Sequence, residues 1–226
     1  MKLISWNIGL VNYIARYCLM CMFKDKENAI DMIFNVIKKE NPDIILFQEL
    51  YKYDIQTIKN KFAVDFPYII HSEKNGLAIL SKNKVFKIDT LTFNQDCLSH
   101  LLDTYNGYLL VYDKEKDIYF LNVHLSCGLI IDDEIKAIKE LTETLNKKII
   151  VGGDFNIYRT KIKTKLNKYF YFDENKDNFK NSSFENILLS CNLDYLFEIN
   201  HDECKELDTK IINTFESDHY PISAIF

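Results

Sequence analysis

Most of the residues in this chain that suit catalysis stand at the ends of predicted β-strands. They are Asn7, Gln48, Glu49, His124, Asp154, Asn156, Asp194, Asp218 and His219. Strand ends gather in space even when they are far apart in sequence, and polar residues there often serve binding or catalysis. We therefore expect these side chains to line one pocket at one edge of the fold.

The oxygen-bearing members of this set are suited to a hard cation. Glu49 and Asp218 supply carboxylates, and Asn7 supplies an amide oxygen. Mg²⁺ is usually held by one or two carboxylates and keeps sites for water and phosphate. The sequence therefore predicts a Mg²⁺ site formed by Asn7, Glu49 and Asp218.

The remaining members suit attack of water on a phosphate ester. Asp154 can orient the attacking water, and Asn156 can hold a phosphate oxygen. His124 and His219 can stabilise charge that develops in an in-line displacement. Asp194 can fix the tautomer of one imidazole, with His219 favoured as its partner. The predicted reaction is metal-assisted phosphoester hydrolysis.

These residues must be positioned by the elements that precede and follow them. Short apolar runs rich in β-branched residues predict strands at Lys2–Trp6, Asp43–Phe47, Tyr68–His71, Leu77–Ser81, Val85–Phe93, Tyr108–Tyr112, Ile118–His124, Ile149–Val151, Tyr195–Ile199 and Ile222–Phe226. Apolar spacings of three and four predict helices at Lys26–Lys39, Tyr53–Phe62, Asp132–Leu145 and Phe184–Cys191.

The order of these elements and the composition favour one α+β domain. The chain has 226 residues, of which 47% are hydrophobic, enough for one compact core. A βαβ opening followed by consecutive strands does not fit a purely parallel sheet. We expect residues 1–226 to form a single domain of two mixed, mainly antiparallel sheets, packed face to face with helices outside.

Seven short motifs in order resemble those of the endonuclease/exonuclease/phosphatase (DNase I-like) superfamily. They are Ser5–Asn7, Leu46–Leu50, Asn75–Ser81, Asn122–Leu125, Gly152–Asn156, Leu193–Tyr195 and Ser217–Pro221. The resemblance spans essentially the whole chain. It implies a four-layer α/β-β/α sandwich and dependence on Mg²⁺, with Mn²⁺ as a substitute.

The resemblance also implies a role for each site residue. Asn7, Glu49 and Asp218 surround the metal, and Asp154 activates water. Asn7, His124 and Asn156 contact the substrate, and Asp194 pairs with His219. The Asn-Val-His-Leu context of His124 is similar to the DNase I, deadenylase, tyrosyl phosphodiesterase and sphingomyelinase branches rather than to the abasic-site endonucleases.

Nucleic acid is the expected substrate class. A basic stretch after the Asp154 loop, made of Arg159, Lys161, Lys163, Lys165 and Lys168, could follow a phosphodiester backbone. A solvated helix face explains the same stretch. The net charge of -5 and the presence of only two arginines, Arg16 and Arg159, argue against a broad basic surface.

Two alternatives stay open. One is a sphingomyelinase-like phospholipid phosphodiesterase, suggested by the apolar segment Ile8–Phe23, although core packing explains that segment equally well. The other is a catalytically inert binding protein on the same scaffold. No obligate protein partner is indicated by the sequence.

We expect a soluble, intracellular protein. Asn12 and Arg16 interrupt the segment Ile8–Phe23, which is shorter than the roughly 20 residues that span a bilayer. The six cysteines are expected to be reduced thiols, since a core of this size needs no disulfides. Cys18 and Cys21 have the spacing of zinc ligands, but the sequence has no second CxxC or HxxxH pair that would complete a zinc site.

Overall fold

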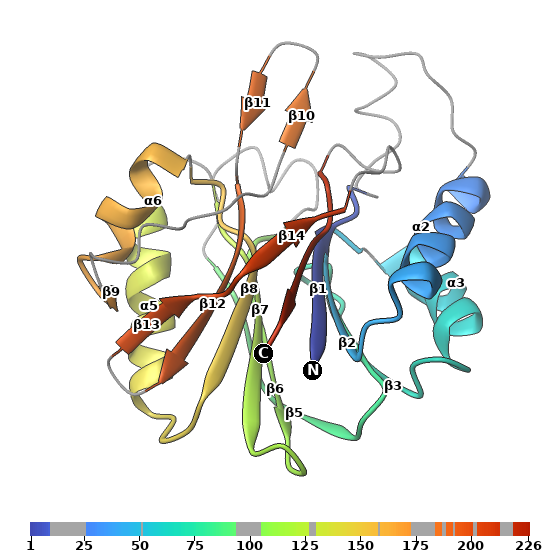
Figure 1. Ribbon diagram of the computed structural model, residues 1–226, viewed down its shortest axis with the longest axis horizontal. Coiled ribbons are helices and arrows are strands. Elements are labelled where there is room, and N and C mark those ends of the chain that lie inside the picture. Colours follow the sequence, from blue (N-terminus) through green and yellow to red (C-terminus); the bar gives the residue numbers. More distant parts are fainter. Residues whose placement is uncertain are drawn as a thin grey trace.

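The computed structural model describes residues 1–9, 26–50, 52–93, 105–126, 130–157, 159–172, 184–186, 189–191, 193–200, 203–212 and 219–226. Within these ranges the chain forms two large sheets with helices on their outer sides (Figure 1). Most of the predicted segment Ile8–Phe23 lies outside the described residues, and so do Cys18, Cys21 and Asp218.

The first sheet has six strands in the order β14-β15-β1-β2-β4-β3. Their bounds are Thr209–Ile211 for β14, Ile222–Ile225 for β15, Lys2–Asn7 for β1, Ile44–Gln48 for β2, Leu77–Ser81 for β4 and Tyr68–Ser72 for β3. Only β1 and β2 pair in parallel; the other pairs are antiparallel. Parallel strands need a long crossover connection, and helix α2, Lys26–Glu40, lies in the connection between β1 and β2.

The second sheet has seven strands in the order β5-β6-β7-β8-β12-β13-β9. Their bounds are Val85–Thr92 for β5, Gly107–Asp113 for β6, Ile118–His124 for β7, Ile149–Asp154 for β8, Asp194–Asn200 for β12, Glu203–Glu206 for β13 and Tyr171–Phe172 for β9. Strands β7 and β8 are parallel, with helix α5, Ile131–Glu143, between them. The predicted mixed, mainly antiparallel sheets are therefore confirmed.

Three apolar layers hold the sandwich together. Because side chains alternate across a strand, β2 sends Ile44 and Leu46 toward the second sheet, and Ile45 and Phe47 toward the helices. Helix α2 and helix α3, Lys52–Phe62, cover the outer face of the first sheet. Helix α5 and helix α6, Arg159–Leu166, cover the second (Figure 1). This is the predicted four-layer α/β-β/α arrangement.

The helix predicted at Phe184–Cys191 is wrong. Its apolar residues have helical spacing, but the segment forms the short strands β10, Phe184–Asn186, and β11, Leu189–Cys191. They pair antiparallel, with Phe184 opposite Cys191. A helix of two turns has little stability of its own, so local pairing decides the structure of such a segment. The sequence also missed β9, β13 and β14, which have between two and four residues.

Two amides join the two sheets across the interior of the sandwich. Gln48, at the end of β2, donates from Nε2 to Asn122 Oδ1 on β7 at 2.7 Å. Asn122 Nδ2 returns bonds to the carbonyls of Phe47, at 2.8 Å, and Ala78, at 3.0 Å. Both amides are fully buried. We call this contact the amide bridge; it fixes the offset between β2 and β7.

Removing this bridge should destabilise the fold. We expect Asn122→Leu to lower the free energy of unfolding by about 3 kcal/mol, because Gln48 and two main-chain carbonyls lose buried partners. Urea denaturation measures this change. The matched control is Asn60→Leu on the exposed face of α3, which should change stability by less than about 0.5 kcal/mol. Equal losses in the two variants would contradict a structural role for the bridge.

No helix in the part of the chain that the structure describes is long and apolar enough to cross a bilayer. Cys204 is a buried free thiol.

Candidate active site

Strand pairing brings the predicted site residues to one end of the sandwich. In the second sheet, Asp154 at the end of β8 stands opposite His124 on β7 and opposite Asp194 on β12. In the first sheet, Asn7 at the end of β1 stands opposite Gln48, the residue before Glu49. The two sheets thus present their functional ends side by side.

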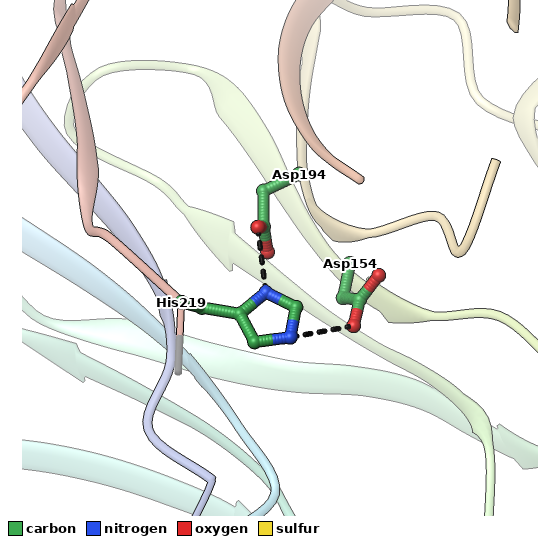
Figure 2. A group of neighbouring side chains, drawn as sticks. All are labelled: Asp154, Asp194 and His219. Carbon is green, nitrogen blue, oxygen red and sulfur yellow. Dashed lines mark hydrogen bonds and ion pairs between the residues drawn. The ribbon is translucent and has the colours of Figure 1, made fainter. Parts of the chain in front are cut away.

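Asp154 lies at the centre of this cluster and is buried. Its Oδ2 accepts a hydrogen bond from Asn7 Nδ2 at 3.0 Å and lies 3.7 Å from Nε2 of both His124 and His219. Its Oδ1 accepts the main-chain N–H of Asn156 at 2.8 Å. Figure 2 shows Asp154 facing the ring of His219, with Asp194 on the other side of the ring. One carboxylate therefore contacts residues from both sheets.

The two glycines before Asp154 allow this close approach. Gly153 has a φ of 150°, and a Cβ there would lie 1.9 Å from the Val123 carbonyl oxygen on β7. A Cβ on Gly152 would lie 2.4 Å from Leu196 Cδ2 and 2.8 Å from Leu46 Cδ1 of the other sheet. Any larger residue would push β8 away from its neighbours, so the Gly-Gly pair sets the depth of Asp154.

Glu49 stands in a turn that holds its backbone in a strained conformation. Its φ is 60°, in the left-handed region that glycine favours. The next residue, Leu50, is held at both main-chain groups: its N–H donates to Gly76 O at 2.7 Å, and its carbonyl contacts His71 Nε2 at 3.0 Å. Burial lowers the pKa of His71, which favours the neutral ring in this contact. His71, which belongs to none of the sequence motifs, thus supports the Glu49 turn.

Asn7 links the two carboxylates. Its Nδ2 donates to Glu49 Oε1 and to Asp154 Oδ2, both at 3.0 Å, and its Oδ1 accepts the N–H of Gly9 at 3.0 Å. The amide oxygen predicted to bind metal thus accepts a main-chain hydrogen bond in this structure.

His219 and Asp194 form the predicted pair. His219 Nδ1 lies 2.8 Å from Asp194 Oδ2, and both residues are buried. Because an ionised carboxylate only accepts hydrogen bonds, Nδ1 donates and Nε2 is directed toward Asp154. Trp6 Nε1 also donates to the His219 carbonyl at 3.0 Å, which anchors this residue to β1.

Asn156 is placed beside the cluster by an unusual backbone. Its φ is 49°, a conformation that asparagine tolerates better than most residues. Its Nδ2 donates to the Leu125 carbonyl at 2.7 Å. The side chain therefore ties the Asp154 loop to the residue after His124, and its contact with phosphate stays a prediction.

The donors in this site fit a divalent cation. Glu49 and Asp154 bring two carboxylates to the same amide, and the ion-pair partners that the described residues give them are imidazoles. Asp154, Asp194 and His219 also offer ligand atoms within 4.8 Å of one another. Hard oxygen ligands gathered in this way are suited to Mg²⁺ or Mn²⁺.

The basic stretch of α6 is partly occupied by structural contacts. Lys165 and Lys168 donate to the two carboxylate oxygens of Asp132 on α5, at 2.6 and 3.0 Å. The hydrogen bond from Lys165, followed by that from Lys168, lowers the pKa of Asp132. These two lysines tie α6 to α5 and are less available to a polyanion.

Comparisons with known proteins agree with this architecture. A sequence model described as the Endonuclease/Exonuclease/phosphatase family matches residues 4–195. An uncharacterized protein of Acanthamoeba polyphaga mimivirus is 29% identical over 159 residues. That match covers 58% of this chain, and the chain spans 59% of the length of this curated relative.

Three solved structures are similar over nearly the whole chain. SmcL has a TM-score of 0.78 at 15% identity, with 99% of this chain and 97% of that chain covered. A Staphylococcus aureus beta toxin mutant with bound magnesium ions has a TM-score of 0.74 at 17% identity, with 99% and 98% covered. TDP2 of D. rerio, complexed with a single-strand DNA product, has a TM-score of 0.67 at 14% identity, with 99% of this chain and 97% of that chain covered. These likenesses show the fold. Because the family model matches most of the length of this chain, the chain belongs to the Endonuclease/Exonuclease/phosphatase family.

Proposed function

We propose that this protein is a Mg²⁺-dependent phosphodiesterase that hydrolyses its substrate by in-line attack of water. The observation that carries the proposal is the position of Asp154, which contacts Asn7 of one sheet and faces His124 and His219. A phosphodiester resists attack by water unless its charge is offset and the water is aligned. This cluster combines groups for both tasks.

Glu49 and Asn7, with Asp218, would hold the metal, which when bound supplies a Lewis acid at the phosphate. Asp154 aligns the attacking water and takes its proton. His219, held at Nδ1 by Asp194, presents Nε2 to the non-bridging oxygens as charge builds on them. His124 approaches the same space from β7 and stabilises the same charge.

Nucleic acid is the substrate class that we propose. The structure of D. rerio TDP2 with a single-strand DNA product shows that this fold can accommodate a nucleic acid strand. Of the basic stretch, Lys161 is exposed, whereas Lys165 and Lys168 are bound to Asp132. A phospholipid phosphodiester and binding without turnover are the competing outcomes.

A substrate panel tests this choice. We expect Mg²⁺-dependent cleavage of labelled single-stranded or duplex DNA, RNA or a 5′-tyrosyl oligonucleotide. Sphingomyelin in mixed micelles serves as the competing substrate in the same buffer. Turnover of sphingomyelin alone would replace the nucleic-acid assignment with the lipid one, and turnover of nothing would support an inert binding protein.

The metal requirement depends on Glu49. We expect Glu49→Ala, or excess chelator, to lower turnover by at least about a hundredfold, because the Lewis acid contributes several kcal/mol to the transition state. Steady-state kinetics across a Mg²⁺ titration measure this. The matched control is Glu140→Ala on the exposed face of α5, which should keep wild-type turnover. Full activity of Glu49→Ala in chelator would contradict the proposed metal site.

His219 and Asp194 should act as one unit. His219→Ala is expected to lower kcat by roughly a hundredfold or more, and adding Asp194→Ala should cost little further, since residues that act together are not additive. A cycle of His219→Ala with Asp117→Ala, whose carboxylate lies in the exposed β6–β7 turn, is the control and should be additive. Effects of His219 and Asp194 that multiply cleanly would show that the two side chains work independently.

A further inference from the structure

Glu134 is a buried carboxylate that the site chemistry described above does not use. It lies in the first turn of α5 and is only 4% exposed. Its Oε2 accepts the main-chain N–H of Ser126 at 2.8 Å, and its Oε1 accepts the Ser126 hydroxyl at 2.5 Å. Asn106 Nδ2 in turn donates to Ser126 Oγ at 2.9 Å. The carboxylate thus clamps one residue by both its main chain and its side chain.

A buried carboxylate is costly for a fold to keep. Burial raises the pKa of Glu134, and the hydrogen bonds from Ser126 oppose that shift. After these hydrogen bonds, the electrostatic interaction with His124 also lowers the pKa of Glu134. A neutral or apolar side chain at this helix position would avoid the cost of desolvation. The clamp therefore merits a functional explanation.

Ser126 stands two residues after His124, so the clamp acts on the backbone that carries this imidazole. Leu125, between them, donates its N–H to the Asp154 carbonyl at 2.9 Å and accepts Asn156 Nδ2 at 2.7 Å. Residues 124–126 are consequently held from the Asp154 loop on one side and from α5 on the other. Loss of the Glu134 clamp would remove the support from α5 and leave the Asp154 loop, the Asn106 contact and the pairing of β7 with β6.

His124 needs such support more than His219 does. The ring of His219 is oriented by a carboxylate at Nδ1. His124 Nδ1 is buried and has no hydrogen-bond partner among the residues that the structure describes. A ring without a partner on its far nitrogen is oriented by its backbone and by packing, and small displacements in a catalytic site are expensive.

We propose that Glu134 is a positioning residue that acts through Ser126 to hold His124 beside Asp154 and Glu49. This inference rests on the proposed phosphodiesterase function. Glu134 does not touch the reacting atoms. Its carboxylate accepts two hydrogen bonds from Ser126 at once, whereas an amide there would have to donate to a hydroxyl that already accepts from Asn106.

Glu134→Gln tests the proposal while preserving the shape of the side chain. The amide turns one acceptor into a donor, so the Ser126 hydroxyl would have to reverse its bond while it also accepts from Asn106. The probe is the labelled oligonucleotide of the substrate panel that the wild-type protein cleaves. We expect its kcat to fall roughly ten- to a hundredfold with KM within about twofold, as for other displacements of a catalytic group. The matched control is Asp133→Asn, which removes an exposed carboxylate from the same helical turn and should keep wild-type kinetics. Ser126→Ala, which keeps the main-chain bond, should give a smaller loss.

Two further measurements separate positioning from loss of stability. In a His124→Ala background, Glu134→Gln should cost little more, whereas a general structural defect would multiply with it. The ring resonances of His124, assigned through His124→Ala, should shift or broaden in Glu134→Gln while those of His219 stay unchanged. Additive kinetics with unchanged His124 resonances would overturn the proposal. Perturbed His124 resonances in a protein that hydrolyses no phosphodiester would support the clamp and reject the proposed function instead.

Discussion

The amide bridge between Gln48 and Asn122 fixes the relation between the two sheets on which the site depends. Glu49 directly follows Gln48 in the first sheet, and His124 stands two residues after Asn122 in the second. A shift of one sheet against the other would change the separation of Glu49 from Asp154 and His124. Apolar contacts are non-directional, whereas hydrogen bonds between two buried amides weaken when their distance or angle changes.

This fixed relation places the carboxylate of Asp154 beside residues of both sheets. Two glycines let β8 come close to β7, so that its carboxylate meets Asn7 from the other sheet. Two carboxylates that share one amide concentrate negative charge, which the neighbouring imidazoles and a divalent cation can offset. Acidic and imidazole groups brought together in this way contribute little to the stability of the fold, which is why we propose a catalytic role for them.

The sequence predicts the fold class and brings several candidate site residues to one place, because apolar strands are followed by polar residues at their ends. His124, Asp154, Asp194 and His219 do meet, as that pattern predicts. The segment Phe184–Cys191 was misjudged because its apolar spacing fits a helix while the chain there pairs as strands. Glu134 is not predicted from the sequence for a different reason. It is one of three consecutive acidic residues in the first turn of α5, and only the tertiary packing shows that it is buried.

We propose that Asp154 is the base that aligns water in a metal-dependent hydrolase. Its most direct test is the turnover of Asp154→Asn at saturating Mg²⁺, beside a Mg²⁺ titration of the same variant. We expect this variant to fold, to bind Mg²⁺ and to lose turnover by roughly two to four orders of magnitude, the usual contribution of a general base. A loss smaller than about tenfold would contradict it, because the amide keeps the shape of the side chain and removes only its basicity.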